Sequence, residues 1–131
     1  MRRRILIDPR HTKSADLPLR NSTRWDILLW LLRRYRRLRV TGDSMLPLLP
    51  PGCEVLVDPA AYRQRVPEPD DVVVAHHPMQ PELRIIKRVQ FVEPDGRCYL
   101  RGDNTHASSD SRQFGLIAHA QLQGKVICFF P

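Results

Sequence analysis

The chain has 131 residues and a mass of 15.2 kDa, which fits one domain with a modest hydrophobic core rather than a multidomain protein. Its net charge of +7 is uneven, because residues 1–40 carry 12 Lys/Arg against 3 Asp/Glu, whereas residues 41–131 carry 9 against 11. The basic side chains therefore belong to an N-terminal segment, and the pI of about 10.0 is weak evidence for a nucleic-acid-binding domain.

The N-terminal segment predicts a basic arm followed by one helix. Residues 1–22 are basic and lack a hydrophobic period, and we expect a flexible arm there. The apolar stretch that follows the basic start ends after three residues, so it is not typical of a secretory signal. Thr23 and Asp26 have capping-box spacing, and apolar residues follow at helical intervals, which predicts an amphipathic helix over 23–37.

This predicted helix bears on where in the cell the protein is expected to act. Its apolar run, residues 25–32, would span only about 12 Å, less than the roughly 30 Å hydrocarbon core, so we expect no transmembrane anchor in it. Three interpretations of this helix stay open. It packs over a β core, it lies at a membrane surface with its arginines on lipid head groups, or it docks an acidic protein. Three cysteines without C-x-x-C spacing favour reduced thiols, and we expect a cytoplasmic protein with peripheral membrane contact as an option.

The remaining residues, 38–131, predict a single mainly β domain. Short runs rich in β-branched residues, separated by Pro- and Gly-containing turns, indicate the strands. These are expected at 38–41, 54–58, 71–76, 83–92, 97–101 and 124–129. The expected fold class is therefore mainly β with one short N-terminal helix.

Lys87 has an unusual position in the longest of these strands. Alternation over residues 83–91 puts Lys87 on one face together with apolar side chains. Those side chains are Leu83, Ile85, Val89 and Phe91. A buried ammonium is costly unless it is paired or neutral, and burial lowers the pKa of a lysine toward that of a general base. The alternative is a lysine at a strand end that reaches water.

Upstream, Ser44 lies in a tight apolar segment punctuated by prolines. The turn signal Thr41-Gly42-Asp43 precedes it, and Pro47 limits any helical continuation to about one turn. A serine at such a junction projects outward, with its backbone amide free to point at a substrate carbonyl. Most serines after Gly-Asp are turn residues, but Ser44 together with a buried lysine is typical of a Ser–Lys nucleophile pair.

Four sequence blocks together resemble the type I signal peptidase family. In the family's order they are Gly42-Asp43-Ser44-Met45-Leu46-Pro47, Pro51-Gly52-Cys53-Glu54-Val55-Leu56-Val57, Ile86-Lys87-Arg88-Val89, and Gly102-Asp103-Asn104-Thr105-His106-Ala107-Ser108-Ser109-Asp110-Ser111-Arg112. The first block is short, whereas the last, G-D-N-x-x-x-S-x-D-S-R, is long and specific. The resemblance implies a signal-peptidase-like β fold, shared with the self-cleaving repressors, and serine endopeptidase activity in residues 38–131.

The resemblance also assigns roles. It implies that Ser44 is the nucleophile, with its amide as one oxyanion donor, and that Lys87 is the general base. Ser108 matches the serine that orients this lysine, and Asp110 and Arg112 match a charged pair that braces the site.

Three positions beside the nucleophile complete the expected site. Some relatives carry a hydroxyl two residues before the nucleophile as a second oxyanion donor, but this chain has Gly42 there, as other members do. The second donor is therefore not identified. Met45 is expected to line the substrate groove or to be a core methionine beside a turn. Asp43 is expected at the substrate-binding segment.

Within this family, the small size, the absence of an expected anchor and the form of residues 42–52 resemble the nickel-type superoxide dismutase maturation proteases. Those are thought to remove a short N-terminal leader from the dismutase precursor. We therefore expect a leader-bearing precursor as partner, most specifically nickel superoxide dismutase, with no cofactor and no nucleic acid. The alternatives are signal-peptidase-like processing of exported proteins at the membrane surface, and a non-catalytic or nucleic-acid-binding relative of the self-cleaving repressors.

Histidine chemistry is not expected. No signature position that requires a histidine holds one, and His106 occupies a variable slot. His76, His77 and His119 lack the spacing of metal ligands, so neither a Ser–His–Asp triad nor a metal site is predicted.

Overall fold

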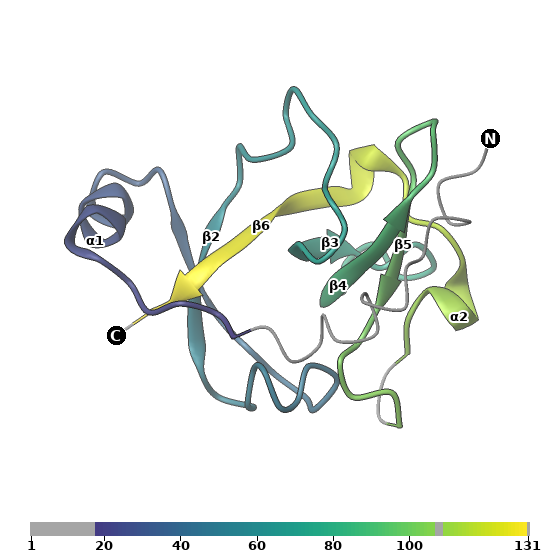
Figure 1. Ribbon diagram of the computed structural model, residues 1–131, viewed down its shortest axis with the longest axis horizontal. Helices are drawn as coiled ribbons and strands as arrows, with labels where there is room; N and C mark the ends of the chain where they lie inside the picture. Colours follow the sequence, from purple (N-terminus) through teal and green to yellow (C-terminus); the bar gives the residue numbers. More distant parts are fainter. Residues whose placement is uncertain (1–17, 107–108, 131) are drawn as a thin grey trace.

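The computed structural model describes residues 18–106 and 109–130, where six strands form one antiparallel sheet (Figure 1). The elements are α1 (Arg24–Leu31), β1 (Arg36–Arg39), β2 (Glu54–Asp58), β3 (Val72–His76), β4 (Arg84–Val92), β5 (Cys98–Arg101), α2 (Ser111–Phe114), the 3-10 helix η3 (His119–Gln121) and β6 (Leu122–Phe129). The strands lie in the order β1-β2-β6-β3-β4-β5. The prediction of a mainly β fold with one short N-terminal helix is confirmed.

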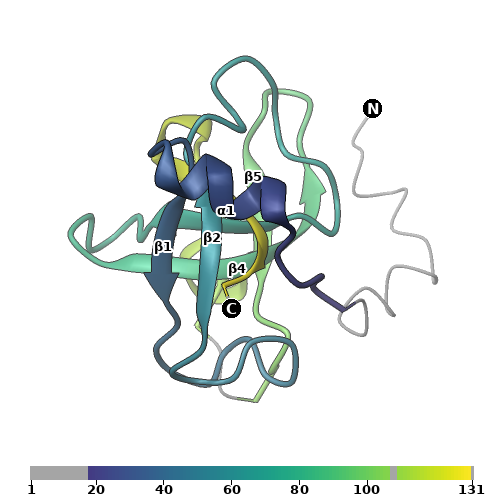
Figure 2. The same cartoon turned by 90° about the vertical axis from the view of Figure 1, so that its left-hand side faces the viewer.

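Apolar side chains pack on both faces of this sheet. The central strand β3 is buried throughout its first four residues, with Val72 and Val74 in one hydrophobic cluster and Val73 and Ala75 in the other. In Figure 2, β4 runs across the direction of β1 and β2. The chain therefore encloses two small cores instead of one flat layer, which explains why β3 is a continuous apolar run.

The predicted helix over 23–37 is too long, because α1 ends at Leu31. Arg33 has a φ of 61°, and the amides of Arg33 and Arg34 donate to the carbonyls of Trp30 and Leu29, which is a Schellman ending. Residues 36–39 then form β1 and pair with residues 54–57 of β2. Residues 36 and 37 were predicted to continue the helix, but pairing with β2 places them in a strand instead.

The start of α1 is anchored to the sheet. Thr23 and Asp26 form the predicted capping box, and Asp26 is buried. Arg20 forms an ion pair with Asp26. The backbone carbonyl of Arg20 accepts a hydrogen bond from the amide of Phe129 on β6. The predicted arm over 1–22 lies mostly outside the described residues, but residues 20 and 21 contact the domain. No helix within the described residues is long and apolar enough to cross a membrane.

Candidate active site

Ser44 lies in the loop that follows β1. Val40 and Cys53 close this loop, because the Val40 amide donates to the Cys53 carbonyl at 2.8 Å and the Gly52 amide donates back to Val40 at 2.8 Å. Gly42 has a φ of 77°, a conformation that side chains rarely adopt, so the turn before Ser44 requires glycine. Ser44 is half-buried at the start of the turn that follows.

Lys87 lies in β4, opposite Val73 of β3, and its residue is only 4% exposed. Ile85 and Val89 share its face of the strand. They pack in the hydrophobic cluster that also contains Val73 and Ala75 of β3, which we call the second cluster. The prediction that this lysine lies on an apolar face is confirmed. Burial lowers the pKa of Lys87, and the charge of Arg112 lowers it further, against the opposing charge of Asp110.

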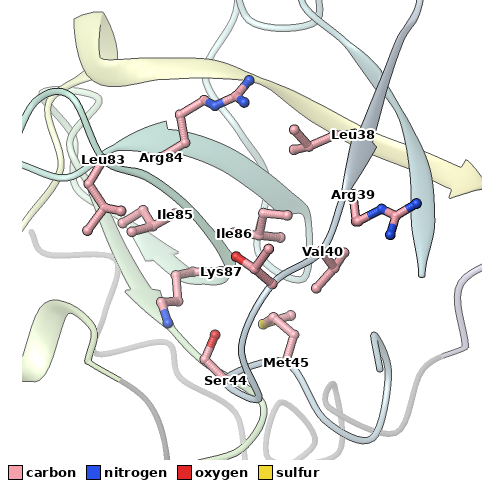
Figure 3. Close-up of a pocket in the computed structure, with 11 residues that line it drawn as sticks. Leu38, Arg39, Val40, Ser44, Met45, Leu83, Arg84, Ile85, Ile86 and Lys87 are labelled. Atoms are coloured by element: carbon pink, nitrogen blue, oxygen red, sulfur yellow. The ribbon is translucent and has the colours of Figure 1, made fainter. Parts of the chain in front are cut away.

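Ser44 and Lys87 meet in one groove. Residues 38–41 and 44–45 form one wall, residues 83–87 form the other, and the cavity between them holds about 370 Å³. Figure 3 shows the side chains of Ser44 and Lys87 pointing toward one another at one end of this cavity. The structure therefore brings together the two residues that the sequence predicts as nucleophile and base.

The last sequence block holds the serine loop in place. The backbone amide of Asn104 donates to the carbonyl of Ser44 at 2.8 Å, and the Asn104 side-chain amide donates to the carbonyl of Asp43 at 3.1 Å. Two short turns, 60 residues apart in sequence, are thereby joined. This contact gives Asn104, the last residue of the Gly-Asp-Asn triplet, a structural role.

Sequence reasoning missed a buried ion pair between Arg88 and Asp103. Arg88 Nε and Nη2 donate to the two Asp103 carboxylate oxygens at 2.9 Å each, and Arg88 Nη1 donates to the carbonyl of Asp70 at 3.2 Å. The two side chains are 7% and 2% exposed. Both residues belong to the matched blocks. The presence of opposite charges in two different motifs is the sequence signal that could have predicted this ion pair.

The buried carboxylate of Asp110 forms an ion pair with the exposed Arg112, and the charges of both residues act on Lys87. Asp110 is fully buried and caps α2, accepting from the Arg112 and Gly102 amides and from the Arg112 guanidinium. Burial raises the pKa of the Asp110 carboxyl, but these hydrogen bonds outweigh it, so its pKa lies below the ordinary value. Arg112 also donates to the Thr105 carbonyl at 3.1 Å. The bracing expected of this pair has a geometric basis.

Three other predicted site residues have different outcomes. Met45 lines the groove and is also 1% exposed in the first hydrophobic cluster, so the two interpretations of it are compatible. Asp43 is exposed in the turn and is not among the lining residues, and a role in binding substrate stays a prediction. Ser108 lies outside the described residues.

The candidate histidines have structural partners. His77 Nδ1 accepts from the amides of Met79 and Gln80, and His76 contacts the Pro81 carbonyl. Within residues 18–106 and 109–130, no three His, Cys, Asp or Glu side chains gather as they would to hold a metal ion.

A curled antiparallel sheet in which a serine loop faces a buried lysine is the arrangement expected from the sequence blocks. Comparison with known proteins agrees, because residues 27–127 match the family model described as Peptidase S24-like. The chain belongs to this family.

Among curated proteins, the chain is similar to subunits of mitochondrial inner membrane proteases. It is 33% identical over 108 residues to the mitochondrial ATP-independent inner membrane protease subunit 1b of Arabidopsis thaliana, covering 66% of this chain and 64% of that protein. It is 31% identical over 108 residues to mitochondrial inner membrane protease subunit 2 of Danio rerio, covering 66% and 59%. It is 28% identical over 105 residues to subunit 1 of Xenopus tropicalis, covering 66% and 63%.

The chain thus spans less than two thirds of the length of these relatives. Their names support the signal-peptidase-like resemblance. None of the three refers to nickel superoxide dismutase, so that narrower subgroup stays a prediction.

Proposed function

We propose that this protein is a serine endopeptidase that removes an N-terminal leader from precursor proteins in the manner of a signal peptidase. One observation carries the proposal: Ser44 and Lys87 line the same groove, with Lys87 held on an apolar face where the pKa of its ammonium is lowered. A lysine with a lowered pKa beside a serine is typical of an activated nucleophile pair.

In the proposed reaction, neutral Lys87 accepts the hydroxyl proton of Ser44 while Oγ attacks the carbonyl carbon of the scissile peptide. Protonated Lys87 then donates to the leaving amine, and an acyl-enzyme remains. A water molecule, deprotonated by Lys87, then attacks the ester carbonyl. The bond to Ser44 Oγ breaks, Oγ takes the proton from Lys87, and the leader is released. The Ser44 amide has no acceptor among the described residues and is therefore available to the developing oxyanion.

The groove suits an extended peptide. The ladder between β4 and β5 begins at Arg88, so the edge of residues 84–86 that faces away from β3 is open within the described part of the chain. The strand β1 is at the end of the sheet, and among residues 18–106 and 109–130 it pairs only with β2. A leader bound between these two edges gains backbone hydrogen bonds as an added strand.

The names of the relatives favour precursors handled at a membrane, which is the broader of our two substrate expectations. The nickel superoxide dismutase precursor is the narrower one. We propose action on the cytoplasmic side, and three free cysteines support a reducing compartment.

Mass spectrometry of incubated precursors tests this function. Wild type and the variants Ser44→Ala, Lys87→Ala and Lys87→Arg are each mixed with nickel superoxide dismutase precursor and with a panel of exported precursors. We expect wild type alone to make one defined cut, because guanidinium does not act as a base near neutral pH. Lys125→Arg is the matched control, because Lys125 lies outside the groove and pairs with Asp71.

Each outcome is informative. Cutting only of the dismutase precursor would establish the narrower substrate, and cutting of exported precursors would establish the broader one. Near-normal activity of Lys87→Arg would rule out the proposed Ser44–Lys87 dyad. Intact precursors throughout would favour a non-catalytic relative of the self-cleaving repressors.

A further inference from the structure

The outer edge of β5 is covered by the segment that follows the Gly-Asp-Asn turn, and α2 lies beside this strand (Figure 1). β5 is the last strand in the sheet order, so its outward amides have no partner strand among the described elements. Three amides along this edge, at alternate positions, donate instead to residues 110–117. The donor–acceptor pairs are Cys98 to the Ile117 carbonyl at 2.8 Å, Leu100 to Ser111 Oγ at 2.8 Å and Gly102 to Asp110 Oδ2 at 3.1 Å. Side-chain oxygens thus take the place of a neighbouring strand at residues 100 and 102.

Ser111, the first residue of α2, has no part in the proposed reaction, yet only 4% of it is exposed. The hydrogen bond from the Leu100 amide to its hydroxyl is buried. A buried amide that loses its acceptor is costly, because water does not replace the lost partner. Asp110 also caps α2 and forms an ion pair with Arg112, so its removal would disturb several contacts at once. Ser111 is therefore the position at which the hold on β5 can be tested alone.

The backbone held by Ser111 leads directly to the loop of the nucleophile. Leu100 and Gly102 are fixed at the outer edge, and two residues later the Asn104 amide donates to the Ser44 carbonyl at 2.8 Å. The Asn104 side chain donates to the carbonyl of the residue before Ser44 at 3.1 Å. A displacement of residues 100–102 would therefore move the donor that holds Ser44.

The same strand is also the neighbour of the strand that carries the proposed base. Leu100 lies opposite Val89, two residues after Lys87 on β4. β5 is thus paired with the strand of Lys87 on its inner side, held by Ser111 on its outer side, and connected to the Ser44 loop at its end. Because a shift of about 1 Å in a reacting group can lower a rate about 100-fold, the place of β5 matters for the approach of Ser44 to Lys87.

We propose that Ser111 is a positioning residue for the Ser44–Lys87 pair. Its hydroxyl fixes the outer edge of β5, and through the Gly-Asp-Asn turn it sets the position of the nucleophile loop. Ser111 itself lies outside the groove. The kinetic part of this inference rests on the proposed function, whereas the position of the loop is measurable without catalysis.

Amide hydrogen exchange of the full chain, followed by NMR, measures that position. The variant Ser111→Ala is expected to speed exchange of the Leu100 and Asn104 amides about tenfold, because the first loses its acceptor and the second loses the support of its turn. Tyr62→Phe is the matched control. It also removes one buried side-chain oxygen from a hydrogen bond of 2.8 Å, to Asp71, at a residue outside the groove. It is expected to leave both exchange rates unchanged.

Cleavage of a soluble leader peptide, well below the melting temperature, gives the second readout. Ser111→Ala is expected to lower kcat about tenfold and to change KM little, because the residues that line the groove are intact. Tyr62→Phe is expected to keep the kcat of wild type. Asn104→Ala removes the side-chain hydrogen bond to Asp43. The double variant with Ser111→Ala is expected to lose about as much kcat as the worse single variant, because both changes act on one turn.

The outcomes separate this inference from the proposed function. Unchanged exchange of the Asn104 amide in Ser111→Ala overturns the positioning role, and so does a fall in kcat for Tyr62→Phe as large as for Ser111→Ala. A double variant whose loss is the product of the two single losses also overturns it, because the two residues would then act separately. If wild type cuts no peptide while Ser111→Ala still speeds exchange of the Asn104 amide, the proposed function fails and the hold of Ser111 on the loop stands.

Discussion

Arg88 and Asp103 link the two halves of the candidate site through a buried bidentate ion pair. Arg88 follows Lys87 on β4, and Asp103 precedes Asn104, whose amide holds the carbonyl of Ser44 at 2.8 Å. The strand that carries Lys87, the proposed base, is therefore tied to the loop that carries Ser44, the proposed nucleophile. Lys87 and Arg88 point to opposite faces of the same strand, so adjacent residues serve different functions.

Breaking this ion pair is expected to loosen the site. Asp103→Asn leaves the Arg88 guanidinium buried without its counter-charge, and we expect a loss of about 3 kcal/mol in the free energy of unfolding. The double variant Arg88→Met with Asp103→Leu is expected to lose less than the sum of the single changes. Urea denaturation and kcat/KM, measured well below the melting temperature, check both effects.

The exposed pair Arg37–Glu54 is the control for this cycle, because it is also bidentate but lies at the surface. Neutralising it is expected to change stability very little. Additive losses in the Arg88–Asp103 cycle, or full activity of Asp103→Asn, would show that the pair does not couple strand and loop.

The pH dependence of activity should follow the protonation of Lys87. Only the neutral amine is a base, so kcat/KM is expected to rise with pH and level off above the lowered pKa of Lys87. Arg112 contributes to that lowering, so Arg112→Gln should raise the pKa of Lys87 and move the rising limb to higher pH. Arg63→Gln should not move it. A limb that stays in place or moves to lower pH would contradict this electrostatic role.

Two buried carboxylates should govern acid stability. The Arg20 guanidinium holds the pKa of Asp26 well below its ordinary value, and Asp110 is lowered by Arg112 and the Gly102 amide despite its burial. A carboxyl with a depressed folded-state pKa stabilises fully above its unfolded value, near 4, and loses that contribution as pH falls.

Stability should therefore fall as pH drops below about 4, and Asp26→Asn should make that fall shallower while lowering stability at pH 7 by about 1–3 kcal/mol. Thermal unfolding from pH 7 to pH 2 measures this. Asp95→Asn is a control, because that carboxylate is exposed. An equal slope for wild type and Asp26→Asn would refute the assignment.

Much of the fold could be predicted because the strands have strong local signals. The strand at 54–58 was predicted with its observed ends, and β3, β4 and β5 each begin one residue after the predicted start. Part of the site could also be predicted, because the alternation puts Lys87 on an apolar face. The resemblance of four sequence blocks was needed to favour a base over a lysine that reaches water and to pair Lys87 with Ser44. The shape of the groove could not be predicted, since it depends on how β1 lies relative to β4.

The end of α1 could not be predicted for a different reason. The chain turns at Arg33, with a positive φ that glycine usually supplies, so the usual stop signal is absent from the sequence. Only the pairing of Arg37 and Leu38 with β2 reveals the change from helix to strand.

Arg33→Gly is therefore expected to stabilise the protein by about 0.5 kcal/mol, because glycine adopts this conformation without the steric cost of a Cβ. The greater freedom of glycine in the unfolded chain limits the gain. Arg34→Gly, one residue later and without a positive φ, is expected to destabilise. Urea denaturation compares the free energies of unfolding of the two variants. If Arg33→Gly lost as much stability as Arg34→Gly, the positive φ of Arg33 would not be a source of strain.

The exposed face of α1 gives the last prediction. Its apolar side chains at Trp25, Leu31 and Leu32 are each more than 60% exposed, and Leu28 is 41% exposed. Exposed arginines precede and follow them in sequence. A tryptophan and leucines bordered by arginines suit the surface of an anionic membrane better than water. We therefore expect the protein to float with vesicles that contain an anionic phospholipid and not with neutral vesicles.

Serine at all four apolar positions should abolish flotation while leaving cleavage of soluble peptides unchanged, because these side chains lie outside the groove. Met79→Ser removes another exposed apolar side chain, 75% exposed and far from α1 in sequence, and should float as wild type does. Equal flotation of the four-serine variant would show that another surface of the protein binds the vesicles. Because α1 leads through β1 into the loop of Ser44, contact of this face with lipid would hold the groove beside the membrane surface.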